Sequence, residues 1–166
     1  MADSTRLEPS ALTLALGRIP SGLFILTARR GDRASGMLAS WVQQAGFRPP
    51  MLTTAVRHDR FIADWIAASG RFTLNQLRAG QKRLIQHFAR GFAADAAAFD
   101  GLALLPDADP RGGPVLADAL AFLDVEVAGE LAGGDHRIFL ARIIAGAVLA
   151  PGAEPMLHVR RSGSHY

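Results

Sequence analysis

The sequence predicts an antiparallel α+β domain whose strands form a barrel or a strongly curled sheet. Three observations support this class: about six β-rich segments, Gly-containing turns between two pairs of them, and helical patterns inserted without a β-α-β rhythm. The length of 166 residues corresponds to one domain, and 49% hydrophobic with only 20% charged residues exclude a disordered chain. We therefore expect a single globular domain over residues 1–166.

The chain opens with a helical pattern that is followed by a β-hairpin. Residues Pro9 to Leu16 predict a short helix because proline favours the first helical turn, and Gly17 offers a left-handed end. The β-rich residues 22–29 and 34–44 flank the Gly31-Asp32 pair, which is typical of a tight turn. The two segments are therefore expected to pair as antiparallel strands.

Two consecutive prolines mark the beginning of the next strand. The pair Pro49-Pro50 cannot donate hydrogen bonds to a ladder, so the strand is expected over residues 51–57. A helix follows over residues 59–69, with Asp59 as its N-cap and Gly70 at its end. Its apolar side chains share one face and are expected to cover the sheet: Phe61, Ile62, Trp65 and Ile66.

The centre of the chain is less regular. Residues 71–77 favour a strand despite imperfect alternation, and residues 81–89 return to helical spacing. The segment 91–114 is rich in Gly, Asp and Pro, so we expect mostly loop with a short strand at 102–105. An irregular segment of this length is usually functional or part of an interface.

A second hairpin is expected near the C-terminus. Residues 120–131 and 137–149 are both β-like, and residues 132–136 with their glycines join them. The first of these strands alternates clearly, with one face carrying Phe122, Asp124 and Glu126 and the other carrying Leu123, Val125 and Val127.

Several common catalytic and metal-binding patterns are absent from the sequence. The chain has no cysteine, which excludes disulfides, thiol catalysis and Cys-ligated metals. None of the five histidines stands four residues from another, and no Gly-x-Ser-x-Gly, phosphate-loop or dinucleotide glycine pattern is present. We therefore expect neither a metal site nor a serine hydrolase.

No targeting or membrane-spanning segment is expected. Asp3, Arg6 and Glu8 interrupt the region where the apolar core of a signal peptide would lie. The longest strongly apolar stretch, Ile138 to Pro151, contains Arg142 and is shorter than the roughly 20 residues of a membrane helix. The expectation is a soluble, cytoplasmic protein without a membrane partner.

The excess of positive charge is small and dispersed. The formal net charge is +3, and the 18 basic residues alternate with 15 acidic ones. Aromatic residues make up only 7% of the chain and are not interleaved with arginines, as stacking platforms for bases require. No nucleic-acid partner is therefore expected, and each functional arginine must be argued singly.

Small residues gather in the second strand segment. Residues 35–41, Ser-Gly-Met-Leu-Ala-Ser-Trp, would let a flat ligand approach the main-chain amides. Gly36 is equally compatible with a β-bulge, and Ser40 with an ordinary strand hydroxyl. Both interpretations stay open on this pattern alone.

Five segments that follow one another along the chain carry a further signal. They are residues 19–27, residues 35–45, Phe47 with Pro49-Pro50, residues 72–77, and Gly134-Asp135-His136. In this order they resemble the flavin reductase-like family, and most closely the flavin reductase domain at the C-terminus of cyanobacterial diflavin flavoproteins and its free-standing relatives. The similarity extends from about Leu16 to Tyr166. It implies an FMN-binding antiparallel split β-barrel with a few peripheral helices, and a homodimer whose flavin lies in a groove near the subunit interface.

The same resemblance implies roles for particular residues. The isoalloxazine ring would be lined, largely through main-chain groups, by Met37, Leu38, Ala39, Ser40 and Trp41. Ser40 and Gln43 would reach the ribityl chain and phosphate, and the phosphate site would be completed by Val56, Arg57 and Arg60. Many family members carry a hydroxyl residue where this chain has Leu38, so only the amide can serve there. The alternative for Arg57 and Arg60 is an ordinary surface charge.

The implied activity is an NAD(P)H-dependent flavin reductase, in which a hydride moves from C4 of NADH or NADPH to N5 of FMN, with FAD as the alternative flavin. This chemistry is intrinsic to the cofactors and needs no protein nucleophile. His136 is the candidate catalytic residue, beside the flavin and the nicotinamide; the alternative is a turn residue capped by Asp135. A flavin-dependent oxygenase or another electron acceptor would consume the product. The competing function is an FMN-binding electron-transfer or partner module without its own NAD(P)H activity.

Overall fold

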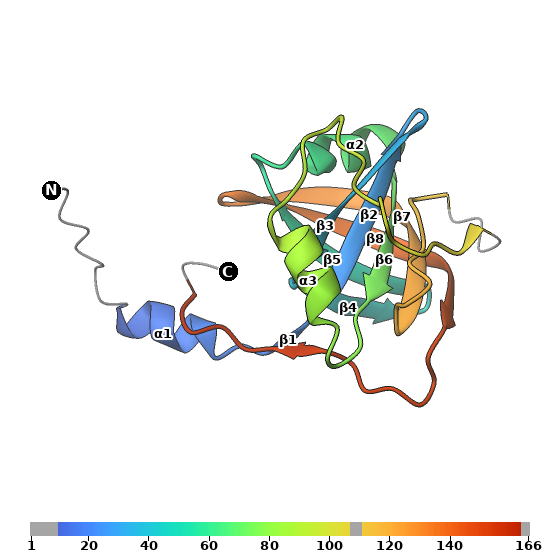
Figure 1. Ribbon diagram of the computed structural model, residues 1–166. Coiled ribbons are helices and arrows are strands. Elements are labelled where there is room, and N and C mark those ends of the chain that lie inside the picture. Colours follow the sequence, from blue (N-terminus) through green and yellow to red (C-terminus); the bar gives the residue numbers. More distant parts are fainter. Residues whose placement is uncertain (1–9, 107–110, 164–166) are drawn as a thin grey trace, which may run out of the picture.

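A curled antiparallel sheet of seven strands, in the order β3-β2-β6-β7-β8-β5-β4, dominates the structure (Figure 1). The computed structural model describes residues 10–106 and 111–163. The seven strands are β2 (Phe24–Arg30), β3 (Arg33–Ala39), β4 (Val42–Phe47), β5 (Pro50–Arg57), β6 (Arg71–Gln76), β7 (Ala121–Gly133) and β8 (His136–Val148). The sheet and its three helices confirm the predicted α+β class, and both predicted hairpins are present as β2–β3 and β7–β8.

The chain connection between β3 and β4 closes the sheet into a split barrel. These two strands are the edges of the sheet, yet β3 ends at Ala39 and β4 begins at Val42. The Cα atoms of Ala39 and Val42 are three residue steps and so at most about 11 Å apart, and the sheet must curl until its two edges meet at this point. The predicted single strand over residues 34–44 is therefore wrong, because Ser40 and Trp41 divide it into two strands on opposite edges.

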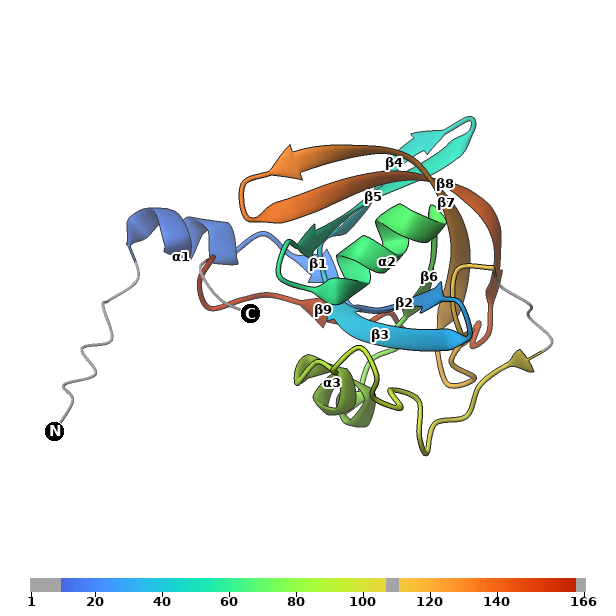
Figure 2. The ribbon, with the colours of Figure 1, turned by 90° about the horizontal axis from the view of Figure 1, so that it is seen from above.

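Helix α2 (Phe61–Ser69) fills the mouth of the barrel. Figure 2 shows it enclosed by the curled sheet, with Ile62, Ala63, Trp65 and Ile66 buried. Gly70 ends the helix at a φ of 67°, as predicted. The predicted N-cap was wrong: the cap position falls on Arg60, and the Asp59 carboxylate binds the Arg57 guanidinium at 2.7 Å instead. No helix in the described part of the chain is long and apolar enough to cross a membrane.

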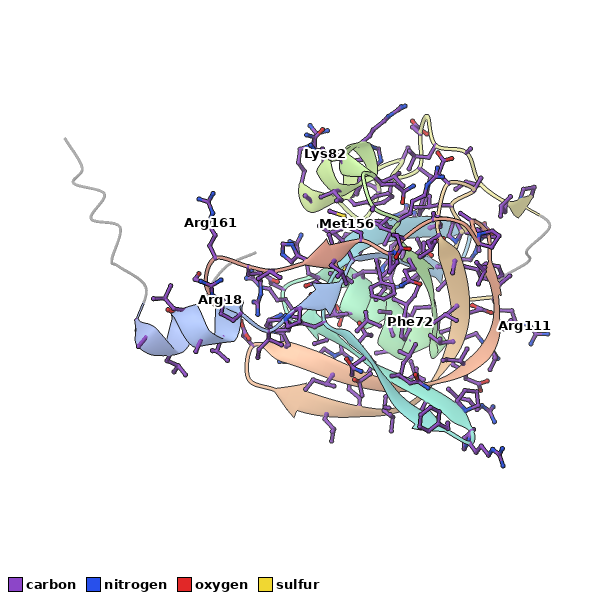
Figure 3. The ribbon with its side chains drawn as sticks, turned by 90° about the horizontal axis from the view of Figure 1, so that it is seen from below. Arg18, Phe72, Lys82, Arg111, Met156 and Arg161 are labelled. Carbon is purple, nitrogen blue, oxygen red and sulfur yellow. The ribbon has the colours of Figure 1, made fainter. Side chains whose placement is uncertain are left out.

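The core lies in two clusters, one on each side of strands β2 and β6. Inside the barrel, α2 packs against buried side chains that include Leu26, Leu74, Phe139 and Phe72, whose place among the strands is visible in Figure 3. Outside it, helix α3 (Lys82–Ala89) packs Leu84 and Phe88 against a second buried group, Leu23, Ile25 and Leu77. Burial of both faces explains why β2 is apolar on both sides. On β6 the inner face carries Phe72 and Leu74, and the outer face carries the buried polar residues Thr73 and Asn75.

Helix α1 (Ala11–Gly17) and the C-terminal segment run side by side away from the barrel (Figure 1). Ser10 caps the helix, since its Oγ accepts the Thr13 N–H at 3.3 Å, and the predicted start at Pro9 lies outside the described residues. The predicted left-handed end at Gly17 is wrong. Gly17 is needed for space instead, because a Cβ atom there would lie 2.8 Å from the Ser162 Cα atom. We call α1 and the C-terminal segment beside it the arm. Where the arm joins the barrel, β1 (Ser21–Gly22) pairs with β9 (Leu157–His158).

Asp124 lies on the outer face of β7, where it pairs with Thr73 of β6, while its neighbour Val125 pairs with Phe72 and faces the barrel core. Asp124 is nevertheless only 3% exposed, because residues 111 and 112 of the predicted loop cover it. Its carboxylate accepts hydrogen bonds from the Thr73 hydroxyl at 2.9 Å, the Gly112 N–H at 2.9 Å and the Arg111 N–H at 3.1 Å. Asp124 thus holds part of the predicted loop against the sheet. The predicted strand at 102–105 is wrong, because the structure has an isolated bridge there, between Leu104 and Leu116.

Candidate functional site

The Ser40-Trp41 link between the two sheet edges separates two surface cavities. The Trp41 carbonyl accepts a hydrogen bond from the Ala55 N–H at 3.0 Å, which fixes the link against strand β5. Ala55 lines both cavities, so they meet across this one small side chain. The point where the barrel closes is therefore also the point where these two surface hollows converge.

The larger cavity has a volume of about 440 Å³. Three of the predicted site residues, Ser40, Trp41 and Gln43, lie in its wall. The remaining lining residues come from the base of the arm and from strands β4, β5 and β8: Ile19, Pro20, Ser21, Gly22, Val42, Thr53, Thr54, Ala55, Ile138 and Leu157. A cavity of this size and largely apolar lining matches those that hold ring systems.

The smaller cavity has a volume of about 100 Å³ and carries positive charge. Its lining combines four predicted residues, Met37, Leu38, Arg57 and Arg60, with Ala55, Phe88 and Ala89. Arg57 is already paired with Asp59 at 2.7 Å, whereas no ion pair among the described residues includes Arg60. Arg60 is half-buried and also borders a neighbouring hollow of about 90 Å³. It is therefore the cation that is available to an anionic group.

Two predicted residues have their side chains in the barrel core. Ala39 is 4% exposed and Val56 is fully buried, and both pack against the cluster around α2. Only their main-chain groups can contribute to a site. The Leu38 side chain packs partly against the second cluster around Phe88, so the space that a polar side chain would use is filled.

His136 lies beneath Trp41 at the start of β8. The two rings have centroids 4.6 Å apart and are tilted by 40°. The His136 Nδ1 atom is 2.7 Å from Asp135 Oδ1, and this hydrogen bond lowers the pKa of the Asp135 carboxyl. The side chain is only 7% exposed, and its Nε2 atom has no hydrogen-bond partner in the described residues. His136 is thus both a turn residue held by Asp135 and a buried imidazole with one unused nitrogen.

Three of the five buried side-chain polar atoms without hydrogen-bond partners among the described residues lie near the barrel closure; the other two, Ser35 Oγ and Arg71 Nη1, are on β3 and β6. Ser40 Oγ and Thr54 Oγ1 are buried in the wall of the larger cavity and make no hydrogen bond there, and His136 Nε2 lies close by under Trp41. Unsatisfied buried polar atoms are costly, and several in one place indicate a missing partner. A flat ring with donors and acceptors along its edge fits this arrangement. A metal does not, since the described residues contain no group of three or more His, Asp or Glu side chains placed to hold one.

Several lining residues were missed by the sequence interpretation. Ala55 and Thr53 could have been found, because alternation along strand 51–57 places them on the outer face with Arg57. Phe88, Ala89 and Leu157 could not, because α3 and β9 reach the cavities only through the packing of segments that are distant in sequence.

Comparisons with known proteins identify the family of this chain. The family model described as "Flavin reductase like domain" matches residues 16–164. A diflavin flavoprotein of Nostoc is 41% identical over 93% of this chain, and diflavin flavoprotein A 1 of Synechocystis is 39% identical over 95%. In both cases the chain spans only 27% of the relative's length.

A solved structure, the NADH:FAD oxidoreductase SgcE6 of Streptomyces globisporus, is 27% identical, with a TM-score of 0.80 over 88% of this chain and 85% of that one. SgcE6 has also been solved in complex with NAD and FAD fragments, with a TM-score of 0.77 over 87% of this chain and 84% of that one. The family model matches nearly the whole described chain, and the chain folds as a split barrel. The chain belongs to the flavin reductase-like domain family.

Proposed function

We propose that this chain is an NAD(P)H-dependent flavin reductase that binds FMN, with FAD as the alternative flavin. The observation that carries the proposal is the meeting of two cavities at Ala55. One is of ring size and has buried polar atoms without partners in the described chain, and the other is lined by Arg60, which has no ion-pair partner there. Family membership and the SgcE6 relative support flavin reduction as the class of activity.

The two cavities suit the two chemically different parts of a flavin nucleotide. The isoalloxazine ring would occupy the larger cavity, next to Ser40 and Trp41, with Met37 and Leu38 lining the smaller cavity beside it. The phosphate would lie near Arg57 and Arg60, because guanidinium groups donate charge-assisted hydrogen bonds to phosphate oxygens. Gln43, on the exposed side of the wall, would contact the ribityl chain.

When bound, the flavin would supply the acceptor for a hydride from reduced nicotinamide. The protein's part is to hold two rings in contact and to keep water out. Trp41 lines the site and packs at a tilt on His136 behind it, and Asp135 fixes the orientation of the imidazole at 2.7 Å. The His136 Nε2 atom is buried and has no hydrogen-bond partner in the described residues, so it would meet a bound ligand only after a shift of the Trp41 indole.

The test is anaerobic reduction of the flavin-loaded protein. Purified protein saturated with FMN is mixed with NADH or NADPH, and the flavin absorption band is followed. We expect the band to bleach with at least one of the two nicotinamides. A protein that retains FMN but does not bleach with either would contradict the proposal.

A second candidate function is a flavin-binding electron-transfer module that receives electrons from a separate protein. It is favoured by the fact that the curated diflavin relatives are about four times longer than the matched region, which is 27% of their length. Tight FMN retention with negligible NAD(P)H turnover would support it over the reductase. Either function would pass electrons to a further acceptor, such as a flavin-dependent oxygenase.

We also propose that two chains form a homodimer around this site. The arm at the base of the larger cavity exposes apolar side chains that a second copy would cover: Leu12, Leu14, Ile19, Leu157 and Val159. Sedimentation at micromolar concentration should give a dimer, and a monomer would contradict both the dimer and an interfacial flavin.

A further inference from the structure

We propose that Arg160 is a positioning residue that fixes the Trp41–His136 pair beside the larger cavity. The inference rests on the proposed function for its effect on flavin binding, but the positioning itself can be measured without flavin. The contacts that carry it connect the C-terminal segment to the closure of the barrel through three side chains.

The Arg160 guanidinium is fixed on the face of Trp41. Its Cζ atom lies 5.1 Å from the centroid of the Trp41 ring, within the range of a cation–aromatic contact. The Arg160 main-chain N–H donates to the Gly17 carbonyl at 3.1 Å, and the Nη2 atom lies 3.5 Å from the Leu16 carbonyl. Arg160 therefore connects the last turn of α1 to Trp41. This position suits a cation, because the carbonyl groups at the C-terminus of a helix carry partial negative charge.

No carboxylate in the described part of the chain pairs with Arg160. None of the ion pairs there includes it, and the side chain is half-buried. A half-buried guanidinium without a carboxylate partner gains most from an aromatic face. The contact with Trp41 is thus the main fixed interaction of this side chain.

Trp41 passes this restraint to His136. The indole contacts the imidazole with 4.6 Å between centroids, and Asp135 holds the other side of the imidazole through Nδ1. Trp41 also lines the larger cavity, so any rotation of the indole changes both the cavity wall and the packing of His136. Arg160 acts on the site through Trp41 and has no direct catalytic role in this proposal.

Arg161 provides a matched control. It is the next residue in the chain and carries the same charge, but it is exposed, and Figure 3 shows it pointing away from the barrel. Three variants are compared with the wild type: Arg160→Ala, Arg160→Lys and Arg161→Ala. Thermal unfolding of each variant verifies that it is folded.

The first measurement is the side-chain NMR spectrum of His136 in flavin-free protein, assigned by its loss in His136→Asn. We expect Arg160→Ala to shift the ring resonances, Arg160→Lys to restore part of the shift, and Arg161→Ala to leave them at their wild-type positions. Unchanged His136 resonances in a folded Arg160→Ala variant, or equal shifts in Arg161→Ala, would overturn the positioning role.

The second measurement is the Kd for FMN by titration. The loss of one cation–aromatic restraint should weaken binding about five-fold in Arg160→Ala, with partial recovery in Arg160→Lys. Equal affinities in wild type and Arg160→Ala would overturn the functional part of the inference. Failure of wild type to reduce flavin would overturn the proposed function alone, because neither readout requires turnover.

Discussion

The guanidinium of Arg60 lies so close to Gly91 that a Cβ atom on residue 91 would be 2.6 Å from Arg60 Nη1. Gly91 also has a φ of 71°, which only glycine adopts without strain. Glycine at position 91, shortly after α3, therefore leaves space for the Arg60 guanidinium. Arg60 is the cation of the smaller cavity that has no ion-pair partner in the described chain.

Gly91→Ala should move the Arg60 guanidinium and weaken FMN binding. A charge-assisted hydrogen bond to phosphate would be lost or lengthened, so we expect affinity to fall by about ten-fold. The measurement is an FMN titration followed by flavin fluorescence. Gly101→Ala is the matched control, since Gly101 has a φ of 72° and a Cβ atom there would meet no described neighbour within 4 Å. Both variants should lose about 1–2 kcal/mol of stability to backbone strain, but only Gly91→Ala should lose affinity.

Arg60→Ala should weaken FMN binding more than Arg57→Ala. Arg60 has no carboxylate partner in the described residues, whereas Asp59 already neutralises Arg57 at 2.7 Å. We expect Arg60→Ala to reduce the affinity by about ten-fold to a hundred-fold, and Arg57→Ala by less. Repeating the titration with riboflavin, which lacks the phosphate, should remove the difference. Arg48→Ala, at an exposed position in the β4–β5 turn, removes the same charge and should leave the affinity unchanged.

Asp124→Asn should destabilise the fold without changing the chemistry of the site. The substitution replaces one carboxylate oxygen by an NH₂ group, so either the Gly112 N–H at 2.9 Å or the Arg111 N–H at 3.1 Å faces a donor where it now has an acceptor. Leaving buried donors without an acceptor costs about 2–4 kcal/mol. Urea unfolding measures the loss. The exposed Asp118, whose contact with Arg78 is 3.8 Å, serves as the control, because Asp118→Asn should cost less than about 1 kcal/mol.

His158 should make the fold less stable in mild acid. Burial of the imidazole, with a smaller contribution from the positive charge of Arg160, lowers its pKa below the ordinary value of 6.5. The unfolded chain then binds a proton at a higher pH than the folded chain does, so stability is lost as pH falls below about 6.5. His158→Gln should therefore lose less stability than the wild type between pH 8 and pH 5.5, measured by thermal unfolding. A larger loss in the variant would contradict this sign.

Local patterns predicted most of the secondary structure. The β2–β3 and β7–β8 hairpins follow from turn residues between β-rich segments, and α2 follows from the spacing of Phe61, Ile62, Trp65 and Ile66. The strand predicted over residues 51–57 from the missing donors of Pro49 and Pro50 is β5, which begins one residue earlier, at Pro50. These features depend on residues within a few positions of one another, which a single sequence displays directly.

The candidate site was predicted only in part. The resemblance pointed to two stretches that line the cavities, 37–43 and 56–60, but it could not separate side chains that face the cavities from those of Ala39 and Val56, which lie in the core. It also gave no sign of Ala55 as the residue shared by both cavities. Whether a side chain is buried or lines a cavity depends on the curl of the whole sheet and on which distant segment covers it, as residues 111 and 112 cover Asp124.

The sequence by itself determined the fold class, the two hairpins, the family and the stretches of chain that line the cavities, because these depend on local turn chemistry, hydrophobic period and motif order. Only the tertiary structure decided that Ser40 and Trp41 divide one predicted strand into two sheet edges, and that Gly17, Gly91 and Gly112 are small because another segment lies against them. The physical reason is that close contacts between distant segments are set by how the sheet closes, and no local pattern encodes that closure.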